Sequence, residues 1–318
     1  MRNMELLAFV ISFAVGVVLC KVLIPVLHKL NFGQQIRKEG PASHLTKYGT
    51  PTMGGIAILF AMIIGTVFFV EDINTVIVLV ITFAFAIIGL LDDVLKIMKK
   101  QSEGLKAWQK LFLQLFATCA LVLYVGLATE GGTETIIPFY GVVDIGGWYY
   151  PLAIVAVLGT VNGANFTDGL DGLATSVTSV ICAFLFAASL MLGASLEAPA
   201  LAMLGALMAF LIFNAYPAKV FMGDTGSLAL GGFVAAMALI MKIPIFIIIF
   251  AFVYLAEIVS VILQVCYFKI THGKKLFKMT PIHHTFELSG WSETRVVVLF
   301  SVVTLICCGI AYVGLAVI

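Results

Sequence analysis

Five aspartates that border long apolar stretches are the side chains best placed to do chemistry. Asp92 and Asp93 follow one apolar stretch, Asp168 and Asp171 lie between two others, and Asp224 precedes a further one. A carboxylate at membrane depth is costly, and is usually kept there for a function. Five carboxylates at such positions predict a metal-dependent site for a phosphate-bearing substrate, located where water meets lipid.

The most specific local motif is NFTDGLDG, residues 165–172. Asp168 and Asp171 are three positions apart and would share one face of a helical turn. The interleaved glycines let backbone N–H groups approach a ligand closely. The motif lacks the acidic ladder of an EF-hand calcium loop. It predicts a ligand site; the alternative is an Asx-type turn that joins two spans.

A second glycine-containing segment, residues 214–227, links two apolar stretches. Asp224 lies in it just ahead of an expected helix, where its oxygens either hold a cation or cap the helix. Phe221 is either a stacking platform for a base or an aromatic residue that faces lipid. The segment 50–55 (TPTMGG) contains no Walker A lysine pattern, so it is not a P-loop.

A histidine pair lies in a basic stretch near the C-terminus. His283 and His284 follow three lysines within residues 274–278, and no HExxH zinc motif is present. The pair fits phosphate binding better than zinc, with a solvated loop pair as the alternative. Glu257 lies in the middle of an apolar stretch, where an ionised carboxylate is expensive. It either belongs to the site or pairs with another polar group inside the membrane.

Composition places the whole chain in a membrane. Of 318 residues, 62% are hydrophobic and 11% are charged, whereas a soluble domain has about 25% charged residues. The net charge of +1 argues against a nucleic-acid-binding protein, which would carry a basic patch. The six cysteines show no CxxC spacing and are interpreted as small buried hydrophobes.

The apolar stretches predict an all-α integral membrane protein with ten transmembrane helices in a single polytopic domain, residues 1–318. A helix needs about 20 apolar residues to cross a bilayer, and the first stretch is too long for a signal peptide. In the fifth span, Gly159, Asn162 and Gly163 are expected to break the end of the helix. The predicted spans are 6–30, 54–70, 74–91, 111–128, 149–162, 173–193, 198–215, 227–241, 244–268 and 296–318.

The basic residues predict the orientation of these spans. Fifteen lysines and arginines fall on one side, only Arg2 and Lys242 fall on the other, and Lys21 lies within a span. Cytoplasmic loops carry the excess of positive charge, so both termini are expected outside. The outer segments 135–140 and 142–145, around Gly141, could form a small hairpin. Five predicted cytoplasmic loops hold the five aspartates in or beside them: 31–53, 92–110, 163–172, 216–226 and 269–295.

Five motifs occur together in an order that resembles a known family. They are TPTMGG, LLDDVLK, NFTDGLDGLA, NAYPAKVFMGDTGSLALGG and TPIHHTFELSGW, spread over nearly the whole chain. Together they resemble the bacterial phospho-N-acetylmuramoyl-pentapeptide transferases, within the polyprenyl-phosphate hexosamine-1-phosphate transferases. The resemblance implies a ten-helix enzyme of the bacterial plasma membrane, often a homodimer, with a Mg²⁺ site on the cytoplasmic face. It also implies transfer of phospho-MurNAc-pentapeptide from UDP to undecaprenyl phosphate, which gives lipid I and UMP.

The resemblance also implies roles for particular residues. Asp224 would be the Mg²⁺ ligand, with Asp92 and Asp93 around the metal and the lipid phosphate. Lys110 and His283 resemble active-site residues of the family. The family usually has three consecutive histidines, so Thr285 is a departure from its pattern. The implied contacts to the nucleoside diphosphate and nearby groups are Lys47, Thr52, Asn165, Asp168, Gly169, Leu170, Asp171, Asn214, Phe221 (under the uracil) and His284.

The reaction so implied is phosphoryl transfer at a pyrophosphate, with Asp92 as the group that deprotonates or orients the lipid phosphate. A two-step route through an aspartyl intermediate remains an alternative. A sister enzyme that transfers GlcNAc-1-phosphate from UDP-GlcNAc is a second interpretation, which the PIHHTFE segment (281–287) disfavours. A nucleotide-sugar or anion transporter is a distant third, because transporters place charged sites near the midplane, often between repeated halves.

Overall fold

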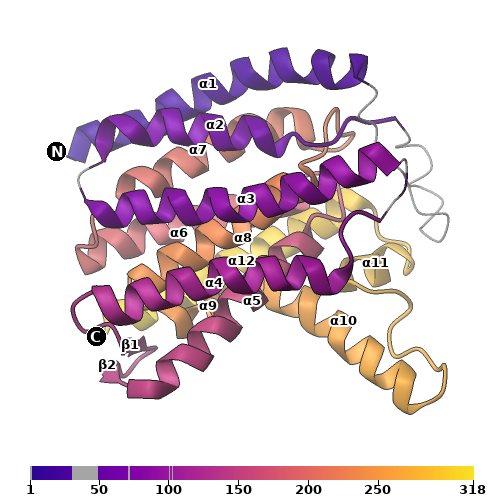
Figure 1. Cartoon of the computed structure of the whole chain (residues 1–318). Helices are drawn as coiled ribbons and strands as arrows, with labels where there is room; N and C mark the ends of the chain where they lie inside the picture. The colour runs from indigo at the N-terminus through magenta and orange to yellow at the C-terminus, as the bar shows by residue number, and fades with distance from the viewer. Residues whose placement is uncertain (1, 31–48, 71, 100, 102) are drawn as a thin grey trace.

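The computed structural model describes residues 2–30, 49–70, 72–99, 101 and 103–318, and this part of the chain is a bundle of long helices (Figure 1). A short antiparallel hairpin, β1 (Glu134–Ile137) and β2 (Gly141–Asp144), lies outside the bundle. The helices are α1 (Arg2–Lys29), α2 (Gly55–Thr66), α3 (Ile73–Lys99), α4 (Ala107–Ala128), α5 (Tyr149–Thr167), α6 (Leu173–Leu192), α7 (Glu197–Asn214), α8 (Gly223–Ile240), α9 (Ile247–Phe250), α10 (Phe252–Ile270), α11 (Ile282–Glu287) and α12 (Glu293–Ala316).

Each of the ten predicted spans contains a helix. Eight helices in the described ranges are long and apolar enough to cross a membrane. The second predicted span is the shorter apolar helix Gly55–Phe69, the fifth is α5, and the ninth begins with the short α9 before α10. The prediction of an all-α, multi-pass membrane protein is therefore confirmed, as is the hairpin around Gly141.

Two predicted helix ends were wrong, and both corrections bear on the site. Helix α5 continues through Asn162 and Gly163 to Thr167. Asn162 is satisfied inside the bundle by Gln114 (2.8 Å), and a methyl group on Gly163 would lie 2.6 Å from the carbonyl oxygen of Tyr254. This glycine therefore permits close packing against α10. Helix α3 continues to Lys99, which places Asp92 and Asp93 about two turns inside the helix.

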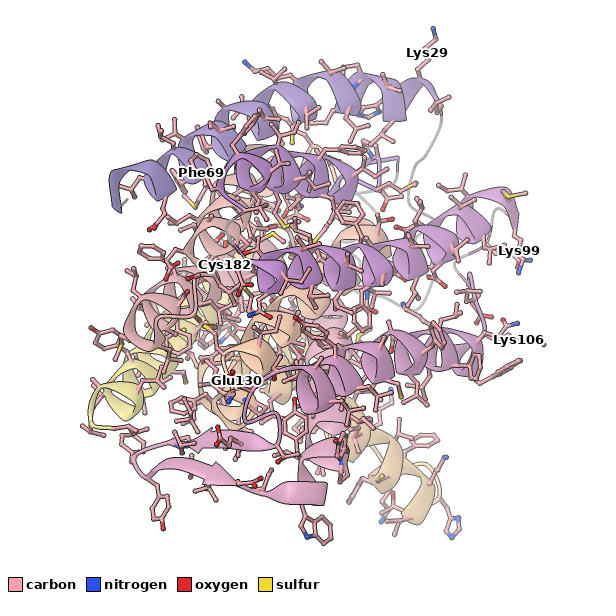
Figure 2. All side chains as sticks on the ribbon, turned by 60° about the vertical axis from the view of Figure 1, so that its left-hand side comes forward. Lys29, Phe69, Lys99, Lys106, Glu130 and Cys182 are labelled. Carbon is pink, nitrogen blue, oxygen red and sulfur yellow. The ribbon has the colours of Figure 1, made fainter. Side chains whose placement is uncertain are left out.

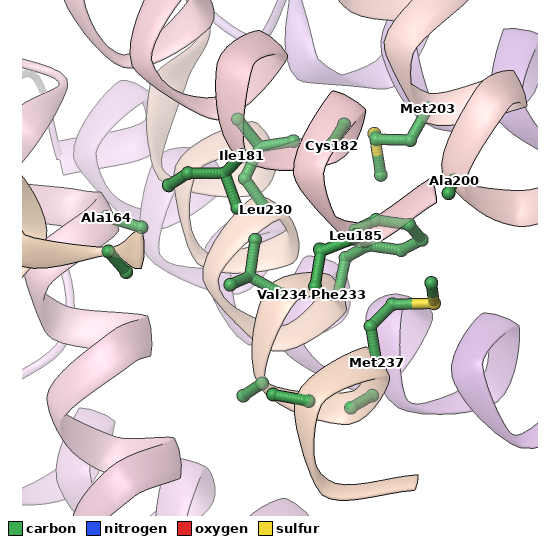
Figure 3. Packing of buried hydrophobic residues seen from close by; sticks show 14 of the residues in the cluster. Ala164, Ile181, Cys182, Leu185, Ala200, Met203, Leu230, Phe233, Val234 and Met237 are labelled. Atoms are coloured by element: carbon green, nitrogen blue, oxygen red, sulfur yellow. The ribbon is translucent and has the colours of Figure 1, made fainter. Parts of the chain in front are cut away.

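Helix α8 lies at the centre of the bundle and is almost entirely buried. Figure 3 shows its Phe233 and Val234 among buried side chains of neighbouring helices. Small residues let those helices come close. A methyl group on Gly89 of α3 would lie 2.0 Å from the carbonyl oxygen of Asp224, so this glycine sets the distance between α3 and the start of α8.

The two ends of the bundle differ in what they carry. Both termini and the hairpin lie at one end, and the turn between α3 and α4 lies at the other with α11 (Figure 1). Figure 2 shows Lys29, Lys99 and Lys106 at this second end. The lysine-rich end is the one predicted to be cytoplasmic.

The six cysteines all lie in the described ranges and carry free thiols. Cys20, Cys182 and Cys308 are buried, as predicted, whereas Cys266 is exposed on the surface of α10. Burial of that thiol was therefore predicted wrongly, because α10 has a wide apolar outer face.

Candidate active site

Asp224, in the first turn of α8, is the hub of a charged cluster. Its Oδ2 atom accepts hydrogen bonds from Lys96 Nζ and Lys110 Nζ, each at 2.8 Å. Its Oδ1 atom accepts from Asn165 Nδ2 at 2.9 Å. Asn165 also donates to Ser227 Oγ at 2.8 Å. Helices α3, α4, α5 and α8 therefore meet at one carboxylate.

Asp93 holds the beginning of α8 in place. Its Oδ1 accepts from the backbone N–H of Asp224 at 3.1 Å, and its Oδ2 accepts from Thr225 N (2.8 Å) and Thr225 Oγ1 (2.7 Å). A helix begins with unpaired N–H groups and a partial positive charge, both of which a carboxylate satisfies. Asp93 is 3% exposed, and its contacts make it the anchor that positions Asp224.

Asp92 points to a different partner. Its Oδ2 pairs with Lys96 Nζ at 2.7 Å, and its Oδ1 accepts from Leu105 N at 2.7 Å. A methyl group on Gly104 would lie 2.6 Å from Asp92 Oδ1. The turn before α4 therefore covers Asp92 closely. Adjacent aspartates on α3 have separate environments because successive helical side chains point about 100° apart.

Asp168 and Asp171 were expected on one face of a helical turn, and the structure differs. Residues 168–172 form a turn between α5 and α6, with Gly172 at a φ of +77°. Asp171 is buried, and its Oδ2 accepts from Ala218 N at 2.9 Å. Asp168 is half-buried. Burial raises the pKa of the Asp168 carboxyl well above its ordinary value, and the nearby negative charges of Asp224, Asp93 and Asp171 raise this pKa further.

Two predicted substrate contacts shape the loop before α8. Asn214 is buried, accepts from Thr175 Oγ1 at 2.7 Å and donates to Val220 O at 2.9 Å. Phe221 N donates to Pro51 O at 2.8 Å, and Gly54 N donates to Phe221 O at 2.9 Å. These bonds bring the segment around Thr52, itself buried, beside the segment of the half-buried Phe221.

Glu257 was expected either to belong to the site or to pair with another polar group inside the membrane. It pairs with His283, at 3.0 Å between Oε1 and Nδ1, so its partner is a predicted site residue. A methyl group on Gly169 would lie 2.2 Å from His283 Nε2, which places the pair against the 168–172 turn. Leu170 of this turn is buried. His284 Nδ1 instead lies 2.8 Å from Glu287 Oε2 within α11.

The structure thus brings Asp92, Asp93, Asn165, Asp224 and Lys110 together. Lys47 lies outside the described residues. Sequence reasoning missed Lys96, Thr225 and Ser227. Lys96 carried a usable signal, because it follows Asp92 by four positions and would lie on the same helical face. Thr225 and Ser227 carried none.

Comparisons with known proteins identify the family of the chain. A family model described as Glycosyl transferase family 4 matches residues 75–242. Phospho-N-acetylmuramoyl-pentapeptide-transferase signature 1 matches residues 47–59.

Relatives named phospho-N-acetylmuramoyl-pentapeptide-transferase match almost the whole chain. The protein of Clostridium perfringens (strain SM101 / Type A) is 50% identical over 314 residues, which cover 97% of this chain and 96% of the relative. The protein of Clostridium novyi (strain NT) is 48% identical over 315 residues, 98% of this chain and 95% of the relative. By its signature and by identity over nearly its full length, the chain belongs to the phospho-N-acetylmuramoyl-pentapeptide-transferase family.

Proposed function

We propose that the protein transfers phospho-MurNAc-pentapeptide from UDP-MurNAc-pentapeptide to undecaprenyl phosphate, and so produces lipid I and UMP. The observation that carries this proposal is the convergence of Asp92, Asp224, Lys96 and Lys110 at one end of a membrane bundle, in a chain about half identical to transferases of that name. A lipid phosphate and a water-soluble nucleotide meet only at such an interface.

The residues around Asp224 fit Mg²⁺. Carboxylate oxygens are hard ligands that Mg²⁺ prefers, and Mg²⁺ is usually bound by one or two carboxylates together with substrate phosphates. Within the described ranges no group of three His, Cys, Asp or Glu side chains is arranged to hold a metal ion, so the substrate phosphates would have to supply further ligands. The two ammonium groups on Asp224 Oδ2 mark the position where positive charge is favoured. When bound, Mg²⁺ would neutralise the diphosphate.

The chain's own residues would then align the reactants. An oxygen of the lipid phosphate attacks the phosphorus that carries the sugar, the bond from that phosphorus to the bridging oxygen breaks, and UMP leaves with this oxygen. Lys96 and Lys110, released from Asp224, would pair with phosphate oxygens. Asp92 orients the lipid phosphate. The lipid phosphate needs no strong base to deprotonate it, because a phosphate with a second pKa of about 6 is largely dianionic at pH 7.

The direct test uses purified protein with undecaprenyl phosphate and either UDP-MurNAc-pentapeptide or UDP-GlcNAc, each with and without Mg²⁺. We expect lipid I and UMP only from the muramoyl substrate with Mg²⁺. Equal turnover of UDP-GlcNAc would favour the sister activity. Uptake of nucleotide sugar into proteoliposomes without transfer would favour a transporter.

We further propose that the lysine-rich end of the bundle faces the cytoplasm, because of the asymmetry of basic residues. A single cysteine introduced at exposed Lys275, in a variant without the native cysteines, tests this side. It should react with a membrane-impermeant reagent only in inverted vesicles; labelling only in intact cells would reverse the topology. We also propose a homodimer, which cross-linking in the membrane would test: a monomer as the only species would contradict it.

A further inference from the structure

Glu257 and His283 form a buried acid–histidine pair outside the Asp224 cluster. The side chains of His283 and Glu257 are 1% and 0% exposed, and Glu257 Oε1 lies 3.0 Å from His283 Nδ1. Glu257 is in the membrane-spanning α10, and His283 is on the short α11. Within the part of the chain that the structure describes, His283 is the one ion-pairing partner of Glu257.

Each member of this pair has a second polar atom without a partner. Glu257 Oε2 and His283 Nε2 are both buried and make no hydrogen bond to any described residue. An unsatisfied buried polar atom costs about 1–3 kcal/mol and therefore calls for an explanation. His283 Nε2 faces Gly169 so closely that a methyl group there would lie 2.2 Å away. The unpaired ring nitrogen is therefore directed at the turn that follows α5.

The charge of the pair determines which group His283 presents. An isolated ionised carboxylate at this depth is expensive, so the pair is favoured when its total charge is zero. Three arrangements meet this condition: a carboxylate with an imidazolium, a protonated Glu257 that donates to Nδ1 of neutral His283, or a protonated Glu257 whose carbonyl oxygen accepts from Nδ1–H. In the first two arrangements His283 Nε2 carries a proton. The third leaves Nε2 bare and puts the carboxyl proton on Glu257 Oε2, which has no hydrogen-bond partner among the described residues, and a buried donor without an acceptor is costly.

We infer that Glu257 is a positioning residue that keeps a proton on His283 Nε2, so that the imidazole donates an N–H toward the Gly169 turn and binds an oxygen of the uridine nucleotide. This inference rests on the proposed function, which supplies that nucleotide. Gly169 is only half-buried, so a small shift of the turn admits a ligand. The acceptor is a phosphate oxygen or a carbonyl oxygen of uracil.

Nitrogen-15 NMR of the ligand-free protein, labelled at histidine, tests the protonation directly. The His283 signal is assigned as the one lost in His283→Gln. We expect a protonated Nε2 in the wild-type protein and an altered His283 signal in Glu257→Gln. A bare Nε2 in the wild-type protein would overturn the inference. This measurement needs no turnover, so its failure is distinct from failure of the proposed transfer.

Binding of uridine and of UMP tests the ligand contact. A hydrogen bond that involves a charged group is typically worth tenfold or more, so Glu257→Leu, which offers no hydrogen bond to Nδ1, should weaken UMP binding by about tenfold. Equal weakening for uridine would identify a carbonyl acceptor, and weakening for UMP alone would identify a phosphate oxygen. His283→Gln, which places an amide N–H near the Nε2 position, should retain more affinity than His283→Asn, whose amide lies near Nδ1. Equal affinities of Glu257→Leu and wild type for both ligands would refute the contact.

Discussion

Lysine–carboxylate pairs lie at both ends of the bundle, with nearly the same bond length. At one end Lys110 Nζ is 2.8 Å from Asp224 Oδ2, with side chains 18% and 16% exposed. At the other end Lys242 Nζ is 2.9 Å from Glu134 Oε2, with side chains 26% and 40% exposed. Asp224 has further partners on α3 and α5, whereas Lys242 Nζ, among the described residues, adds only a bond to the backbone of Glu130.

The two pairs show that burial and shared partners, not the distance between the charged atoms, determine how much the loss of one partner matters. An exposed pair is screened by water and contributes about 0–1 kcal/mol. A pair in a less polar environment interacts more strongly, and removal of one partner leaves the other charge uncompensated. The Asp224 cluster is therefore expected to be sensitive to single substitutions, and the Lys242–Glu134 pair is expected to tolerate them.

The largest effect is expected for Asp224→Asn. The amide cannot replace a carboxylate toward Mg²⁺, and it leaves Lys96 and Lys110 without their shared anion. Loss of one key electrostatic contact typically lowers kcat by about a hundred- to a thousandfold. Steady-state transfer at saturating substrate measures this loss. Near-wild-type kcat at low Mg²⁺ would remove Asp224 from the centre of the cluster.

A smaller effect is expected when the helices that form the cluster are pushed apart. Gly89→Ala would place a methyl group 2.0 Å from Asp224 O and 2.6 Å from Thr225 N. Such overpacking typically costs about 1–3 kcal/mol of unfolding free energy, and it should lower transfer because Asp93 would no longer hold α8. Gly159→Ala is the matched control, since its methyl group would meet nothing within 4 Å. Equal loss in both variants would mean that the close approach of α3 to α8 is unimportant.

Asp168→Asn should raise the stability of the protein while it lowers the rate of transfer. Burial raises the pKa of Asp168 above its ordinary 3.8, so the ionised carboxylate destabilises the folded state at pH 7. The uncharged amide should raise the melting temperature by roughly 2 °C, the order that 1 kcal/mol produces, while transfer falls. The difference should shrink as the pH falls through 3.8 and should vanish well below it, where Asp168 is protonated in both the folded and the unfolded state. Thermal unfolding in detergent at several pH values measures it, and a lower melting temperature at pH 7 would contradict this account.

The smallest effect is expected for Lys242→Met at the hairpin end of the bundle. The pair with Glu134 is partly exposed, so unfolding free energy should change by less than about 1 kcal/mol and transfer should be unchanged. A tenfold loss of transfer would contradict the expectation that the Lys242–Glu134 pair tolerates substitution while the Asp224 cluster does not. Glu134→Gln provides the matched control from the other side of the pair.

Most of the architecture could be predicted because hydropathy is a property of each segment alone. A stretch of apolar residues is favoured in lipid whichever neighbours it has, so the sequence predicted where the apolar helices lie, eight of which are long enough to cross a membrane. The ends of α3 and α5 could not be predicted in this way. Asn162 and Gly163 break a helix in water, but inside the bundle they are satisfied by Gln114 and by close packing on Tyr254.

The sequence by itself determined the membrane class, the family motifs and the gathering of acidic residues at one end of the spans. Only the tertiary structure decided which carboxylate does what. Asp93 caps α8, Asp171 holds the Ala218 backbone, and Asp224 collects Lys96 and Lys110. The physical reason is distance along the chain: these partners are up to 132 positions apart. They meet because bare glycine backbone, above all at Gly89, allows the helices to pack closely.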